Sequence, residues 1–255
     1  MRNLSKVGAR SRAAAWITWL WLVTLASTGS SDSTARAQSG SDGPGGKTSG
    51  LGSLTGVIHY QPDPEHPWKF SRYYIADARQ GLLAECVVVL EGPDLAQKAP
   101  AATPLTRTID QVNFQFVPET SALRTGDTLK VINSDDALHN VMTSDGAQPF
   151  NVSLAKGQEF THRFAQPAGL AGPIRLGCLF HGSMHAWVFV FDHPWFAVTG
   201  RDGRFQLMAV PLGRYTLAVL HPAGKLRWTQ EISLKPGTNA PIQIRLSYAN
   251  RTSAE

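Results

Sequence analysis

The sequence predicts an all-β protein. From residue 54 onward, short runs of β-branched and aromatic residues alternate with Gly, Pro, Asn and Asp, and no stretch has long helical periodicity. The 255 residues are enough for about two domains of ordinary size. The 42% apolar content is that of a globular chain. We therefore expect two β-sandwiches.

The first residues, 1–37, have the pattern of a signal peptide. Basic residues from Arg2 to Arg12 precede an apolar run, 13–27, and Ala35-Arg36-Ala37 provides a small-x-small cleavage site. A retained membrane anchor is the alternative, but the run is shorter than the roughly 20 apolar residues that a bilayer core requires. The segment has no Arg-Arg pair, and no Cys follows the run. We expect export by the general secretory route, a periplasmic or secreted mature chain, and no membrane attachment after cleavage.

The charge of the mature chain argues against a nucleic-acid partner. Cleavage after residue 37 removes five basic residues and one acidic residue, which lowers the formal charge by four, from +5 to +1. The remaining sequence contains no basic run of the kind that binds phosphate backbones.

A Gly- and Ser-rich segment, 38–53, is predicted to be a flexible linker. Two strands, 54–60 and 82–91, follow it, with a surface loop, 61–79, between them. Beyond Pro194, turn residues at 200–203 and 211–213 separate further apolar runs, and Asp-Gly is a strong hairpin signal. The strands expected there are 196–199, 204–210, 214–220, 227–234 and 241–246.

These strands resemble a carboxypeptidase regulatory-like (transthyretin-like) β-sandwich. The motifs that carry the resemblance are Gly56-Val57, Val89-Leu90-Glu91-Gly92, the Thr199 to Phe205 turn, and the Pro211 to Leu217 segment. The resemblance implies a split domain, 54–99 and 195–248, with 100–194 inserted at an exposed loop, where insertions are tolerated. Two consecutive domains are the alternative.

The inserted segment contains a metal-ligand pattern. His139 lies in Leu138-His139-Asn140-Val141, and a Cys-x-x-His-x-x-Met loop follows with Cys178, His181 and Met184. A thiolate, two imidazoles and a thioether form a soft donor set that suits copper, whereas structural zinc normally takes four Cys or His ligands. The loop joins two expected strands, 172–176 and 185–192, so His139 must come from the end of a neighbouring strand.

The inserted segment resembles the cupredoxins, and its short ligand loop is most similar to the amicyanin and methylamine-utilisation branch. The resemblance runs from Gln111 to Val190. It implies a Greek-key sandwich and one type 1 (blue) copper ion. The equatorial ligands would be His139, Cys178 and His181, and the axial ligand Met184. Asn140 would lie just outside the ligand set and tie the two ligand loops together.

Simpler interpretations exist for several of these residues. Cys86 and Cys178 could form a disulfide in an oxidising compartment, although Cys86 opens an apolar run in which a free thiol would act as a small hydrophobe. The copper site could also be vestigial. We expect His185 to point away from the metal, because adjacent strand residues face opposite sides, and we expect His193 and His221 to be surface residues.

The ligand set predicts an electron carrier. A site that holds one geometry, intermediate between those that Cu(I) and Cu(II) prefer, reorganises little when an electron is transferred. The sequence indicates no open coordination position on the metal and no general base, so we do not expect a turnover enzyme. Leu179 and Phe180 would form an apolar patch for a redox partner such as a c-type cytochrome or dehydrogenase. The alternatives are a binding or adhesion module with a structural or vestigial copper domain, and periplasmic copper delivery.

Overall fold

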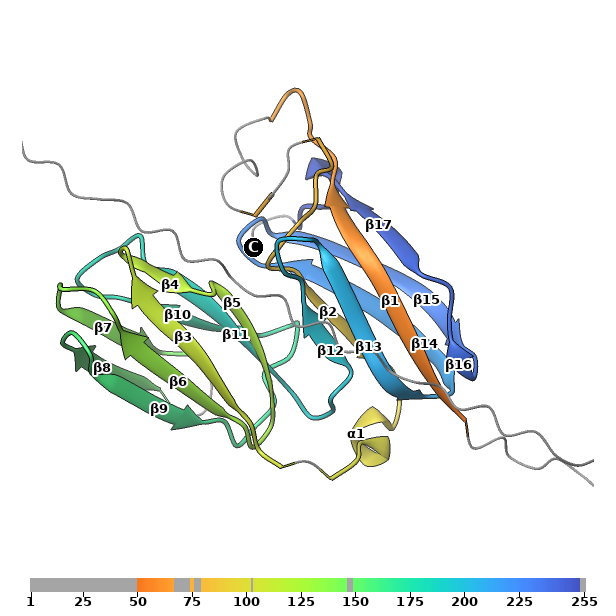
Figure 1. Ribbon diagram of the computed structural model, residues 1–255, viewed down its shortest axis with the longest axis horizontal. Coiled ribbons are helices and arrows are strands. Elements are labelled where there is room, and N and C mark those ends of the chain that lie inside the picture. Colours follow the sequence, from red (N-terminus) through yellow and green to blue (C-terminus); the bar gives the residue numbers. More distant parts are fainter. Residues whose placement is uncertain (1–49, 67–73, 76–78, 102, 146–148, 253–255) are drawn as a thin grey trace, which may run out of the picture. The chain divides into compact units, whose positions relative to one another are not determined.

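The computed structural model describes residues 50–66, 74–75, 79–101, 103–145 and 149–252 (Figure 1). The predicted signal peptide, 1–37, and most of the predicted linker, 38–53, lie outside the described residues. The described residues all belong to one compact unit. Among the described residues, no helix has the length and hydropathy needed to cross a membrane.

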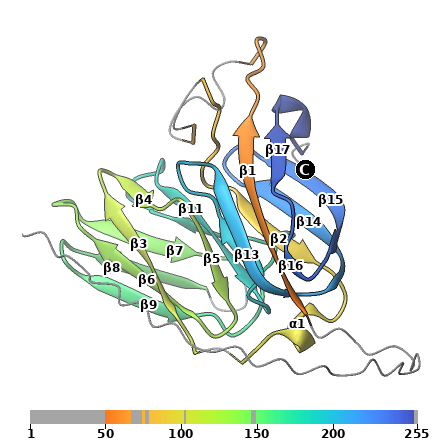
Figure 2. The same ribbon diagram turned by 45° about the vertical axis from the view of Figure 1, so that its right-hand side comes forward.

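The prediction of an all-β fold is confirmed, because strands fold into two pairs of sheets. In the first pair, β1 lies between β13 and β17 and also pairs with β16 (Figure 2), and the opposing sheet has the order β12-β2-β14-β15. The strands are β1 (Leu51–Tyr60), β2 (Val87–Glu91), β12 (Phe196–Val198), β13 (Arg204–Pro211), β14 (Gly213–His221), β15 (Leu226–Leu234), β16 (Gly237–Thr238) and β17 (Ile242–Leu246).

The second pair of sheets is built from the chain between β2 and β12. Its sheets have the orders β5-β11-β10-β7-β8 and β4-β3-β6-β9. The strands are β3 (Thr106–Val112), β4 (Gln115–Val117), β5 (Thr120–Arg124), β6 (Thr128–Asn133), β7 (His139–Thr143), β8 (Phe150–Leu154), β9 (Glu159–Arg163), β10 (Ile174–Gly177) and β11 (His185–Phe191). We call this the second sandwich, and the one above the first sandwich.

Side-chain alternation explains how each sandwich builds its core. In β6 the side chains of Leu129, Val131 and Asn133 point inward and are fully buried, while the intervening residues are half-buried. The run Val87 to Leu90 in β2 is buried on both faces, as expected for a central strand. Seven residues of β2, β14, β5, β11 and a nearby loop form a further apolar cluster: Val87, Val89, Ala122, Leu170, Phe189, Phe191 and Ala218.

The structure differs from the predicted boundaries at a few points. Strand β1 begins at Leu51, inside the predicted linker, because Gly52 pairs with both Val210 and Gly237. The predicted strand over 82–91 is regular only from Val87. A short helix, α1 (Leu95–Lys98), and a 3₁₀ helix, η1 (Tyr248–Asn250), were not predicted.

Candidate metal centre

The Cys-x-x-His-x-x-Met loop joins the hairpin strands β10 and β11. Gly177 pairs with His185 at the end of this hairpin. Inside the loop, the Met184 N–H donates to the His181 carbonyl (2.9 Å) and the Cys178 N–H donates to the Met184 carbonyl (3.3 Å). These bonds close the loop into a tight turn, which brings its side chains together.

Strand β7 brings His139 to the same end of the sheet. It pairs with β10 through Gly177 and Met142. His139 is the first residue of β7 and is fully buried. The expectation that His139 comes from the end of a strand beside the ligand loop therefore agrees with the sheet order.

Three side-chain donors converge at this point. The Nδ1 atoms of His139 and His181 lie 3.1 Å apart, and the Cys178 Sγ lies 3.6 Å from the His181 Nδ1. Among the described residues, this trio is the one group of three or more His, Cys, Asp or Glu whose ligand atoms all lie within 4.8 Å of one another. Cys178 is buried and His181 is half-buried.

The spacing of the donors fits a single bound ion. For metal bonds of about 2.0–2.1 Å to nitrogen and about 2.3 Å to sulfur, these separations correspond to angles of roughly 100° between the nitrogens and roughly 110° between sulfur and nitrogen. Both angles suit a metal ion with three or four ligands. One thiolate and two imidazoles are the donors that favour copper in a trigonal arrangement.

Met184 is the fourth predicted ligand. It is 2% exposed and belongs to the same buried cluster as Cys178. A thioether is a weak ligand in any case, and in trigonal copper sites it takes a long axial position. The structure thus keeps Met184 beside Cys178 inside the core.

Asn140 connects the two segments that carry the donors. Its backbone N–H donates to the Cys178 Sγ (3.3 Å), and its side-chain Oδ1 accepts the Leu179 N–H (3.3 Å). The side-chain amide donates to the Asn151 Oδ1 and the Val152 carbonyl of β8. Asn140 therefore ties the ligand loop to β7 and β8, which is the arrangement that the sequence resemblance implied.

Asp135 was not singled out from the sequence as a site residue, yet it contacts a donor residue directly. Its Oδ2 lies 2.8 Å from the Nε2 of His139, and its carboxylate accepts the N–H groups of Asn113 and Phe114. Burial raises the pKa of Asp135, but the hydrogen bonds from Phe114, His139 and Asn113 together outweigh it and hold the pKa below its usual range. In the sequence, Asp135 is only a carboxylate four residues before His139. This spacing does not predict a contact unless the fold is known.

Phe114 also joins the site without a sequence signal of its own. Its ring meets both imidazoles edge-on, with ring centroids 4.9 Å from His181 and 5.4 Å from His139. His185, by contrast, directs its Nε2 to the Glu119 carboxylate at 2.8 Å and lies outside the donor trio. The expectation that His185 points away from the site agrees with this geometry.

One alternative and one expectation from the sequence are wrong. Cys86 and Cys178 are both free and buried, so they form no disulfide. His193 and His221 are not surface residues, because they are only 6% and 0% exposed. Burial lowers the pKa of both imidazoles, to about 4 for His221. Each has a ring nitrogen that accepts a backbone N–H, from Trp195 and Gly224 respectively.

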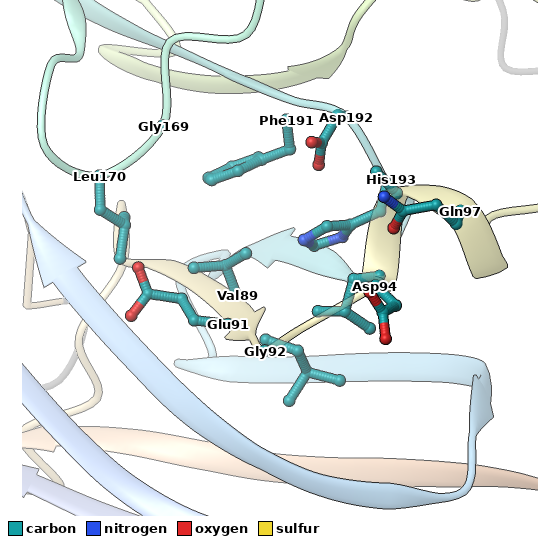
Figure 3. Close-up of a pocket in the computed structure, with 13 residues that line it drawn as sticks. Val89, Glu91, Gly92, Asp94, Gln97, Gly169, Leu170, Phe191, Asp192 and His193 are labelled. Atoms are coloured by element: carbon teal, nitrogen blue, oxygen red, sulfur yellow. The ribbon is translucent and has the colours of Figure 1, made fainter.

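A separate pocket of about 390 Å³ lies next to His193 (Figure 3). Its lining includes Glu91, Asp94 and Asp192. These carboxylates are exposed and come from different segments, and they form no ligand cluster of the kind seen at Cys178. The pocket therefore offers no comparable convergence of donors.

Comparison with known proteins gives structural neighbours only. No protein-family model and no curated protein matches the chain. A Cu-containing nitrite reductase from Thermus scotoductus is similar at a TM-score of 0.32 and 24% identity, over 38% of this chain and 26% of the reductase. The chain thus covers about a quarter of the reductase's length.

Two small cupredoxins are also similar. A purple cupredoxin from Nitrosopumilus maritimus has a TM-score of 0.29 and 24% identity, over 32% of this chain and 97% of that one. A mutant of amicyanin in its Cu(I) form has a TM-score of 0.29 and 19% identity, over 40% of this chain and 97% of amicyanin.

Proposed function

We propose that this chain is an exported type 1 copper protein that carries single electrons. His139, Cys178 and His181 would hold the ion, with Met184 as a weak fourth ligand. The observation that carries the proposal is the convergence of one thiol sulfur and two imidazole nitrogens, at 3.1 and 3.6 Å. Cys178 and His139 are buried there, and His181 is half-buried. This donor set is typical of electron-transfer copper.

A bound copper ion would supply a reversible one-electron couple. The chain's own contribution is to hold the donors still. The Asn140 N–H bonds the Cys178 sulfur, and the ligand loop is closed by its own backbone hydrogen bonds. A site that cannot rearrange favours fast electron transfer, because little reorganisation accompanies the change of charge. Since all four proposed ligands would come from the protein itself, we infer an electron carrier rather than a turnover enzyme.

The surface around His181 supports electron exchange with another protein. Phe114, Leu138, Leu179 and Phe180 are 49%, 52%, 63% and 51% exposed, and they come from the segments that carry or cover the donors. Exposed apolar side chains gathered around a site are typical of protein contact surfaces. We propose that a redox partner, such as a c-type cytochrome or a dehydrogenase of the periplasm, docks over these side chains.

The copper proposal is tested by spectroscopy on three proteins loaded with Cu(II). The wild type should show an intense visible charge-transfer band and narrow copper hyperfine splitting in paramagnetic resonance. Cys178→Ser should lose both features, and the matched control Cys86→Ser should keep them, because Cys86 is buried away from the donor trio. A wild type without the band would overturn the proposal and favour a binding module.

Cycles of reduction and oxidation then separate electron transfer from copper delivery. A protein that carries electrons should keep its ion in both states, whereas a copper donor should release it to a chelator on reduction. Retention through repeated cycles is the expected result. Loss of copper in the reduced state would favour delivery.

Docking is tested with a soluble c-type cytochrome as the probe. Replacing Leu179 and Phe180 together by lysine should slow electron transfer at least tenfold. Met208→Lys is the matched control, because Met208 is 57% exposed but lies on β13 of the first sandwich. Equal rates in all three proteins would place the docking surface elsewhere.

A further inference from the structure

The turn between β3 and β4 has an unusual backbone. Val112 pairs with Gln115, so the turn consists of Asn113 and Phe114 alone. Both residues have positive φ, 54° and 58°. This conformation is the one that two-residue hairpins favour, and Asn adopts it readily. For Phe it is a strained conformation that persists only where the surroundings hold it.

Asp135 is the group that holds this turn. One carboxylate oxygen accepts the Asn113 N–H at 2.7 Å, and the other accepts the Phe114 N–H at 2.9 Å. The Asp135 side chain is only 13% exposed. Its own position is fixed by Asn133, a fully buried residue whose Oδ1 accepts the Asp135 N–H.

The same carboxylate also reaches a donor of the metal centre. Its Oδ2 lies 2.8 Å from the Nε2 of His139, which leaves the Nδ1 of that ring directed at His181. A histidine that binds metal through Nδ1 carries its proton on Nε2, so that three N–H groups converge on one carboxylate. A carboxylate can accept all three, whereas an amide in its place would direct an N–H group at one of them.

The turn in its held conformation places an aromatic ring over the donors. Phe114 meets the His181 and His139 rings edge-on, and its other side faces solvent at 49% exposure. The ring therefore covers His181, the half-buried imidazole of the trio.

We propose that Asp135 is a positioning residue that fixes both the ring of His139 and the Phe114 cover, and thereby sets the reduction potential of the centre. The inference rests on the proposed copper function. Two effects of opposite sign follow. An anionic acceptor on Nε2–H makes the imidazole a stronger donor and favours Cu(II). The Phe114 ring keeps water from the imidazole edge and disfavours the more highly charged Cu(II) state.

The test compares reduction potentials of copper-loaded variants at one pH. In Asp135→Asn the preference for Cu(II) over Cu(I) should fall about tenfold, which raises the potential by about 59 mV. Phe114→Ala should shift the potential in the opposite direction. Asp136→Asn is the matched control, because it removes the same charge from the next residue, whose side chain is 92% exposed and pairs with Lys156. Its potential should stay at the wild-type value.

A second measurement needs no copper. In the copper-free protein, amide hydrogen exchange at Asn113 and Phe114 should be at least tenfold faster in Asp135→Asn than in the wild type or Asp136→Asn.

A third measurement returns to the copper-loaded protein. In the double variant Asp135→Asn, Phe114→Ala, the shift of the reduction potential should differ from the sum of the two single shifts, because the carboxylate acts partly through the ring.

The two proposals fail differently. A wild type without a blue copper signal overturns the copper function. A blue wild type in which Asp135→Asn changes neither the potential nor the exchange of the two amides overturns the role of Asp135. A shift of equal size in Asp136→Asn would assign the effect to general charge and would also overturn it.

Discussion

Each sandwich contains one buried cysteine and one fully buried histidine, but only one sandwich brings them into a common site. In the first sandwich, burial raises the pKa of the Cys86 thiol well above its usual range and lowers the pKa of His221 to about 4, so both side chains stay neutral. In the second, Cys178 and His139 both lie close to His181, so that one ion could bind all three side chains. Burial alone makes such groups inert, and a site needs converging donors.

The largest test of this contrast is the stabilisation by copper. A ligand at about a thousand times its Kd adds about 4 kcal/mol to the free energy of unfolding. Cys178→Ala should abolish this gain. Cys86→Ala should lose about 1 kcal/mol of core packing and keep the full copper effect. Denaturant unfolding with and without copper measures both. A copper effect that survives Cys178→Ala would mean that the ion binds elsewhere.

The second test concerns acid stability and the first sandwich. The pKa of His221 is about 4 in the fold and about 6.5 when unfolded, so the unfolded chain takes up a proton first as the pH falls. The contribution of the neutral His221 ring to the free energy of unfolding is fully present above pH 6.5. It is lost as the pH drops through 4, by up to ~3 kcal/mol.

The free energy of unfolding is measured at pH 7 and pH 4.5 for the copper-free wild type and for copper-free His221→Gln. It should fall more between these pH values in the wild type, because glutamine does not take up a proton. A direct check that needs no variant is the NMR titration of the His221 ring, which should remain neutral down to about pH 4. Titration of this ring near pH 6.5 would contradict the expectation.

The sequence predicted most of the strands and the donor trio for local reasons. Alternating apolar residues and the Asp202-Gly203 turn mark β13 without any knowledge of its partners. The Cys-x-x-His-x-x-Met spacing places Cys178 and His181 on one short loop, so their proximity is also a local property. His139 needed one further inference, that its strand lies beside the loop.

The parts that could not be predicted depend on distant partners. Gly52 belongs to a strand because it pairs with Val210 and Gly237, although its composition is that of a linker. His221 is fully buried, and the ring of Tyr74, a residue distant in the sequence, meets it edge-on. Phe114 reaches the centre only through the conformation of a two-residue turn, which the letters Asn113-Phe114 do not suggest. Asp135 meets His139 across the loop between β6 and β7, a contact that the sequence does not mark.

A third test compares two asparagines that cross-link loops. Asn140 ties the ligand loop to β7, and Asn239 ties Lys235 to Ser53 in the first sandwich. Asn140→Ala should weaken copper binding ten- to a hundredfold, about 1.4–2.7 kcal/mol. Asn239→Ala should lower the stability of the fold and leave copper affinity unchanged. Competition with a chelator of known affinity measures this, and equal affinities in the two variants would deny Asn140 its role.

The smallest expected effect lies at Glu85, whose carboxylate accepts the Thr120 N–H of β5 at 2.6 Å. Burial, with a further contribution from nearby Glu119, raises the pKa of Glu85 to about 7, above its value near 4.5 in the unfolded chain. The folded chain therefore holds a proton that the unfolded chain has released, and stability falls as the pH rises from 4.5 through 7.

Glu85→Gln keeps an oxygen acceptor for Thr120 but cannot ionise. It should be more stable than the wild type by about 1–2 kcal/mol at pH 8, after allowance for solvent screening, and nearly equal to it at pH 5. Glu91→Gln, at the exposed end of β2, is the control and should leave the pH dependence unchanged. If Glu85→Gln were no more stable than the wild type at pH 8, the proton that the folded chain holds would belong to another group. The contact between Glu85 and Thr120 would then make no contribution to the pH dependence of stability.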